Sequence, residues 1–291
     1  MTSRRKFITQ ASLASAGLLF SAGFRRPSVQ KVAGIQLYSL RDQLPANPRD
    51  VIQKVARAGY VEVETFGLNK TTGFWGLSPK QFGEVLKVNG LRTPSGHYDM
   101  NQFFGTRSRE NLDIYIAAAH VLGQEYIIVP SLQEQFIRTE SDFKKVADNM
   151  NAIAAILKKE GLKLGYHNHN FEWKAVDGTT FYDTLVKNTD PGLVYLEMDM
   201  YWVVRAGQDP AVLFGKYKNR FRLIHIKDMD KTNPAINTEV GKGSIDYKGL
   251  IPKAEAAGVR HFLMEQENFT NIDPYVSIKE SADYIKKVLG S

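Results

Sequence analysis

Short apolar segments alternate with amphipathic segments along the chain after residue 30. The apolar segments are rich in β-branched and aromatic residues, which favours strands, and they occupy residues 32–40, 60–66, 91–98, 125–130, 162–169, 193–201, 222–227 and 261–267. The amphipathic segments carry apolar residues at helical spacing, as in 49–58, 79–88, 111–122, 142–160 and 247–257. This order predicts a parallel sheet whose strands are connected by helices.

A closed (β/α)8 TIM barrel is the architecture that this pattern favours, because eight strand–helix repeats in about 250 residues are typical of it. An open doubly wound sheet is the alternative, but that fold places a glycine-rich fingerprint after its first strand. The sequence there is Gln36-Leu37-Tyr38-Ser39, which contains no glycine. We therefore predict one barrel over residues 30–291, without a second domain.

The first 28 residues differ from the rest. Arg4, Arg5 and Lys6 precede a short apolar stretch of small residues, from Ala11 to Phe24. A basic head followed by a short apolar run is typical of a secretory signal, and paired arginines followed by Phe7 resemble a twin-arginine signal. We expect residues 1–28 to direct export to the periplasm or beyond the cell. An ordinary secretory signal and a retained membrane anchor are the alternatives.

Composition and charge narrow the classes of function. The 291 residues are 43% hydrophobic and 24% charged, which is ordinary for a globular protein. With no cysteine, any metal must be held by His, Asp or Glu. The formal charge is +7, but residues 1–26 supply five of the positive charges and no acid, so the remainder carries only +2. We therefore expect no nucleic-acid partner.

Polar residues gather where the predicted strands end, which is the catalytic face of a TIM barrel. Four of the six histidines lie there. The end segments are Glu62-Val63-Glu64, Gly96-His97-Tyr98, Tyr166-His167-Asn168-His169, Glu197-Met198-Asp199, His225-Ile226-Lys227 and Glu265-Gln266-Glu267.

Several of these side chains have both a functional and a structural interpretation. His167 and His169 share one face of a strand, so each is either a ligand or a hydrogen-bonded core residue. Asp199 should face inward, where an unpaired carboxylate is costly and a metal or substrate would pair it. Lys227 shares the face of His225. We interpret three further residues as structural: Glu197, His120 and His261.

These motifs together resemble the xylose isomerase-like sugar phosphate isomerase/epimerase superfamily. The resemblance runs from about Val32 to the C-terminus and rests on Tyr-His-Asn-His-Asn-Phe-Glu (166–172), Asp-Met-Tyr-Trp (199–202), His-Ile-Lys-Asp (225–228), Gly-Lys-Gly-Ser-Ile-Asp (241–246) and Glu-Gln-Glu (265–267). It implies a barrel that binds one divalent metal ion, manganese, cobalt or zinc. The ligands that it implies are His167 (with His169 as the rival), Asp199, His225 and Glu265.

The resemblance implies chemistry at a carbon next to a carbonyl. A divalent cation that binds a hydroxyl and the adjacent carbonyl acidifies the C–H between them. Reprotonation then gives isomerisation or epimerisation, which is the main prediction, on an unphosphorylated sugar. Ketose epimerases have a glutamate where this chain has His167, so elimination from a keto-sugar or keto-glycoside, by a lyase or dehydratase, is the second prediction.

The residue roles follow from this chemistry. We expect Glu265 to be a ligand and base, with His169 and Lys227 as acid/base or oxyanion partners. The substrate-binding residues should be Glu64, His97, Trp202 and Glu267, with Trp202 stacking on a sugar face. A non-catalytic periplasmic sugar-binding barrel and a DNA-repair nuclease are the competing functions. We expect no stable membrane insertion, and a homo-oligomer is left open.

Overall fold

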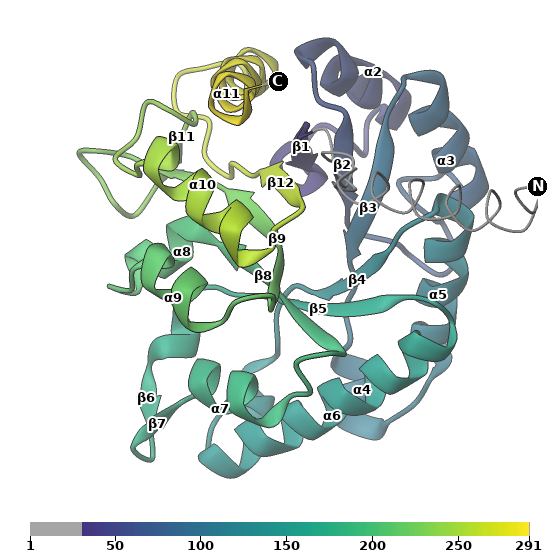
Figure 1. The fold of residues 1–291 in the computed structure, drawn as a ribbon. Helices are drawn as coiled ribbons and strands as arrows, with labels where there is room; N and C mark the ends of the chain where they lie inside the picture. The colour runs from purple at the N-terminus through teal and green to yellow at the C-terminus, as the bar shows by residue number, and fades with distance from the viewer. Residues whose placement is uncertain (1–30, 291) are drawn as a thin grey trace, which may run out of the picture. The chain divides into compact units, whose positions relative to one another are not determined.

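The computed structural model describes residues 31–290, and its strands form a closed parallel barrel surrounded by helices (Figure 1). The predicted (β/α)8 barrel is confirmed. The strands neighbour one another in the order β1-β12-β9-β8-β5-β4-β3-β2. Their bounds are β1 Ala33–Gln36, β2 Glu62–Thr65, β3 Arg92–His97, β4 Tyr126–Val129, β5 Lys163–His167, β8 Val194–Asp199, β9 Phe221–Ile226 and β12 His261–Met264. The predicted export signal, residues 1–28, lies outside the described residues.

The helices lie outside the ring of strands (Figure 1). They are α2 Pro48–Ala58, α3 Pro79–Val88, α4 Asn101–Thr106, α5 Glu110–Leu122, α6 Glu140–Lys159, α7 Phe181–Asn188, α8 Met200–Arg205, α9 Pro210–Lys216, α10 Tyr247–Ala257 and α11 Pro274–Leu289. Two small hairpins are inserted, β6 Ala175–Val176 with β7 Thr179–Thr180, and β10 Asp228–Met229 with β11 Asn237–Thr238. Over residues 31–290, the helices are too short or too polar to span a bilayer.

Local signals explain where the helices begin and end. Ser78 forms a capping box with Gln81 at the start of α3, and Pro79 follows it at the first helical position. Helix α2 ends at Gly59, whose φ of 96° is accessible to glycine at little cost. These signals stop each helix close to the start of the next strand, so the loops on this side of the barrel are short.

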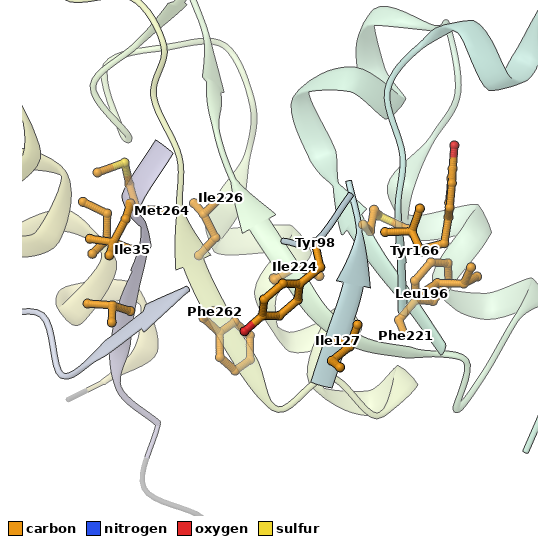
Figure 2. Close-up of a cluster of buried hydrophobic side chains, with 14 of the residues drawn as sticks. Ile35, Tyr98, Ile127, Tyr166, Leu196, Phe221, Ile224, Ile226, Phe262 and Met264 are labelled. Carbon is orange, nitrogen blue, oxygen red and sulfur yellow. The ribbon is translucent and has the colours of Figure 1, made fainter. Parts of the chain in front are cut away.

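Each strand is buried on both faces, and the residues of the two faces belong to two different hydrophobic clusters. Outward-facing residues such as Ile127, Ile224 and Phe262 belong to the large hydrophobic cluster (Figure 2). Alternate residues form a second, smaller cluster of Tyr126, Ile128, Leu223 and Leu263, which we call the barrel plug.

The barrel plug depends on two glycines, each of which is the register partner of one plug residue: Gly34 of Leu263 and Gly165 of Ile128. A Cβ on Gly34 would lie 2.6 Å from Leu263 Cδ2, and one on Gly165 would lie 2.4 Å from Ile128 Cδ1. Leu223 and Leu263 stand two residues before His225 and Glu265, on the same strand face. The plug is therefore an apolar floor beneath the polar strand ends.

All eight barrel strands end before the limits that the sequence predicts, and in β5 and β8 this changes the placement of site residues. Strand β5 ends at His167, so His169 lies in the loop beyond it rather than on the same strand face. Strand β8 ends at Asp199, whose Oδ1 accepts a hydrogen bond from the backbone N–H of Trp202 at 3.2 Å. Asp199 thereby caps α8, and Trp202 is helical.

The barrel plug should contribute strongly to stability. We expect Leu263→Ala to lower the free energy of unfolding by about 2–5 kcal/mol, because a fully buried side chain leaves a cavity. Val88→Ala on α3, where the side chain is 78% exposed, should change it by less than about 0.5 kcal/mol. Equilibrium urea unfolding measures both, and equal effects would contradict the assigned role of the plug.

Candidate metal centre and substrate cavity

Strand register brings the polar strand ends together. Gln36 is paired with Glu64, His167 with Glu197, and Asp199 with His225 in the register of neighbouring strands. Side chains at paired positions of adjacent parallel strands lie on the same face, here the barrel interior. Residues from five strands, β1, β2, β5, β8 and β9, therefore form one buried polar cluster at the C-terminal rim.

A cavity of 420 Å³ opens above this cluster. Its polar end contains His97, His167 and Glu265, and its apolar wall includes Tyr38, Phe66 and Leu68. The remaining lining residues are Gly67, Tyr98, Asp99, Tyr115, Pro130, Ser131, His169, Trp202 and Glu267. A volume of roughly 300–1,000 Å³ is typical of small-molecule sites.

Two overlapping sets of side chains have the spacing of metal ligands. His167, Asp199, His225 and Glu265 form the cavity-side group, and His97, His167, Glu197 and His225 form the deep group. In each group, one ligand atom from every residue lies within 4.8 Å of the others. The cavity-side group is the ligand set that the family resemblance implies, and the structure brings these four residues together.

The cavity-side group fits a divalent ion better than the deep group does. Asp199 Oδ2 is buried and has no hydrogen-bond partner among residues 31–290, and burial raises the pKa of this carboxyl group. A bound cation would compensate this cost. Two imidazoles and two carboxylates suit borderline divalent ions such as zinc, cobalt and manganese. His167 and Glu265 also line the cavity, where a substrate would reach the ion.

In the deep group, His97 is already paired with carboxylates. His97 Nε2 lies 2.8 Å from Glu197 Oε2 and 3.0 Å from Glu64 Oε2. Burial disfavours the charged form of His97, but Glu64 and Glu197 outweigh it and raise the pKa of its imidazole to about 9. The charged ring thus pairs with two buried carboxylates. Glu64, which was expected to contact substrate, is fully buried behind the cavity-side group.

The expected catalytic residues Glu265 and Lys227 are in contact. Lys227 Nζ lies 3.2 Å from Glu265 Oε2 and 3.8 Å from Asp199 Oδ2, and it also contacts Glu267. Burial disfavours both charged forms, yet the attraction of Lys227 and His225 lowers the pKa of Glu265 well below its usual range. Lys227 itself is fully buried and its pKa is raised by the carboxylates around it. The ammonium therefore keeps Glu265 ionised.

His169 and Trp202 stand side by side on the cavity wall, with ring centroids 5.5 Å apart. Burial, followed by repulsion from His167, lowers the pKa of His169 well below its usual range. The Nδ1 atom of His169 and the Nε1 atom of Trp202 have no hydrogen-bond partner within the described chain. Glu267 lines the cavity as expected.

Some residues of the site were not predicted. Gln36 donates to Glu64 Oε2 at 2.7 Å, and strand periodicity two residues beyond Gly34 could have identified it. Glu197, interpreted as structural, contacts His97, His167 and His225. Tyr38 and Phe66 line the cavity from the short 3-10 helix Leu37–Leu40 after β1 and from the residue after β2, although the sequence predicted both as strand residues.

Residues 52–288 match the family described as xylose isomerase-like TIM barrel. Because this match covers most of the chain, the chain belongs to that family, as the sequence motifs predicted.

Among individual proteins, the chain is similar to the inosose dehydratase of Clostridium tetani (37% identity over 34% of this chain and 33% of that protein). It is also similar to that of Clostridium beijerinckii (32% identity over 50% and 53%). The alignments thus span about a third to a half of these curated relatives. A solved structure of a sugar phosphate isomerase/epimerase from Parabacteroides distasonis superposes with a TM-score of 0.77. It is 29% identical and covers 90% of this chain and 95% of that chain.

The purified protein should bind one divalent ion per chain through the cavity-side group. We expect Asp199→Asn to weaken this binding by more than about tenfold, because it removes an anionic ligand. Asp113→Asn, on an exposed residue of α5, should leave the binding unchanged. Elemental analysis after dialysis against manganese, cobalt or zinc measures the stoichiometry. Full retention of the ion by Asp199→Asn would show that the cavity-side group is not the site.

Proposed function

We propose that this protein is a divalent-metal-dependent enzyme that removes a proton next to the carbonyl of an unphosphorylated keto-sugar or keto-glycoside. The observation that carries the proposal is the cavity-side group, which lies at the polar end of the cavity with Glu265 as both ligand and wall residue. When bound, the ion would polarise a hydroxyl and the adjacent carbonyl of the substrate and acidify the C–H between them.

The chain supplies the proton acceptor. Glu265 is ionised and reaches the cavity with a side chain that is only 6% exposed, so water competes little for its carboxylate. Its contact with the Lys227 ammonium favours the negatively charged form of the Glu265 carboxylate. We assign Glu265 as the acceptor of the substrate proton, and its contact with Lys227 fixes the direction in which the carboxylate points.

Elimination of water is the outcome that we favour after this step. The C–H electron pair forms the new C=C bond, the C–O bond to the β-hydroxyl breaks, and the departing hydroxide takes up the proton that Glu265 removed from carbon and leaves as water. His169 lines the cavity, and we assign its neutral imidazole to relaying this proton, which one ring nitrogen accepts while the other releases one. The names of the curated relatives, inosose dehydratase, support elimination.

Isomerisation or epimerisation is the second candidate, and one comparison favours it. The Parabacteroides distasonis protein, described as a sugar phosphate isomerase/epimerase, is similar over almost its whole length. In that case the proton returns to carbon instead of a hydroxyl leaving. The strand-five position holds His167 instead of a second carboxylate, which provides less support for proton transfer on two faces of a sugar.

The cavity favours an unphosphorylated substrate. Within residues 31–290, its lining includes neither lysine nor arginine, the residues that usually bind a phosphate group. Its wall instead presents Tyr38, Phe66 and Trp202, and aromatic faces suit the apolar side of a sugar ring or of a glycoside. We propose a periplasmic or exported location on the basis of the Arg4-Arg5 motif alone.

Proton abstraction can be tested with inosose and a panel of keto-sugars in D2O. We expect Glu265→Gln to lower kcat by about 10²–10⁴-fold, because the amide cannot accept the proton. Glu84→Gln, on an exposed residue of α3, should keep the wild-type rate. NMR measures deuterium incorporation at carbon, and mass spectrometry measures the loss of water.

Each result of this assay has one meaning. Loss of water supports the dehydratase, and deuterium incorporation with unchanged composition supports the isomerase or epimerase. An active Glu265→Gln variant would exclude Glu265 as the base. Binding of sugars to the metal-loaded protein without exchange or elimination would contradict the proposal and favour a sugar-binding barrel.

A further inference from the structure

The imidazole of His225 lies between two carboxylates. Its Nδ1 atom is 3.2 Å from Glu265 Oε2, on the side of the cavity-side group, and its Nε2 atom is 2.8 Å from Glu64 Oε2. The three side chains come from β9, from the residue after β12 and from β2. His225 and Glu64 are both fully buried, so their partners are set by the barrel rather than by solvent.

The two ring nitrogens cannot play the same role when His225 binds a metal ion. A neutral imidazole has one N–H donor and one lone pair. The nitrogen that binds the ion must present its lone pair, so the other nitrogen carries the proton and needs an acceptor. Glu64 Oε2 is such an acceptor, at hydrogen-bond distance from Nε2.

We infer that Glu64 is a positioning residue that fixes His225 as the Nε2–H tautomer and thereby presents Nδ1 to the metal ion. This inference rests on the proposed metal site at the cavity-side group. It assigns Glu64 a role different from the substrate contact expected from the sequence. It also assigns the coordinating atom of His225.

Glu64 is itself held rigidly, as a positioning residue must be. Its Oε2 atom accepts a hydrogen bond from Gln36 Nε2 at 2.7 Å and lies 3.0 Å from His97 Nε2. Gln36 and Glu64 are register partners on β1 and β2, so the backbone ladder sets this contact. The carboxylate therefore has little freedom to turn away from His225.

Strand β2 offers a matched control for this role. Glu62 is two residues earlier, is also buried, and accepts a hydrogen bond in a 2.9 Å contact with Nδ1 of His261. It therefore shares the strand, the burial and a histidine partner with Glu64. His261 begins β12 and lies one strand length before Glu265, away from the cavity-side group.

The test compares the zinc affinity of the full-length wild type, Glu64→Gln and Glu62→Gln by competition with a chromophoric chelator. We expect Glu64→Gln to bind zinc about 10–100-fold more weakly, as is typical when a partner of a metal-bound histidine is lost. Glu62→Gln should stay within about threefold. Wild-type affinity in a folded Glu64→Gln variant would overturn the inference. If the wild type binds no zinc, the proposed metal site itself fails, which is a distinct result.

A second measurement reads the tautomer directly in the zinc-loaded wild-type protein. Long-range ¹H–¹⁵N correlation spectra of the zinc-loaded wild type distinguish a proton on Nε2 from one on Nδ1, and the His225→Gln variant identifies the signals. We expect the Nε2–H form for His225. A proton on Nδ1 would place zinc on the Nε2 side of the ring, among the deep group, and would overturn the inference.

Discussion

Burial of charge inside a closed barrel is the constraint on which the rest of the site depends. Barrel closure points alternate residues of every strand inward, and at the rim these are carboxylates, imidazoles and one lysine. None of them can remain buried and charged without a partner or a metal ion. The short distances among Glu64, His97, Glu197, His225 and Glu265 are the consequence.

The rim therefore has two layers with different chemistry. In the lower layer, the charged His97 lies between Glu64 and Glu197, and each of these two carboxylates keeps one oxygen without a hydrogen-bond partner in residues 31–290. The upper layer leaves Asp199 Oδ2 without a hydrogen-bond partner in residues 31–290 and exposes Glu265 to the cavity. A reactive centre needs such incomplete pairing, because a fully satisfied network has no capacity left for a metal ion or a substrate. The lower layer keeps the upper one in position.

The apolar parts of the structure hold the polar side chains at the rim in position. The barrel plug fills the interior up to the level of Leu223 and Leu263, so the side chains two residues further along begin the polar layer. Gly34 and Gly165 leave the space that these large side chains need. The helices cover the outer strand faces, and the strands thus keep the register that places His167 next to Glu197 and Asp199 next to His225.

The sequence alone determined the barrel and most of the candidate ligands, because strand–helix alternation and polar strand ends are local signals. The motifs that carry the family resemblance implied Asp199, His225, Glu265 and, with His169 as its rival, His167 as ligands, and the structure places His167, Asp199, His225 and Glu265 together. Tertiary structure decided the rest. Strand register and loop paths place Glu64 behind His225 and bring Glu197 into contact with three histidines. They also place Tyr38 and Phe66 on the cavity wall. These arise from contacts such as that between Glu64 and His225, which are 161 positions apart in the sequence, and no local pattern contains such contacts.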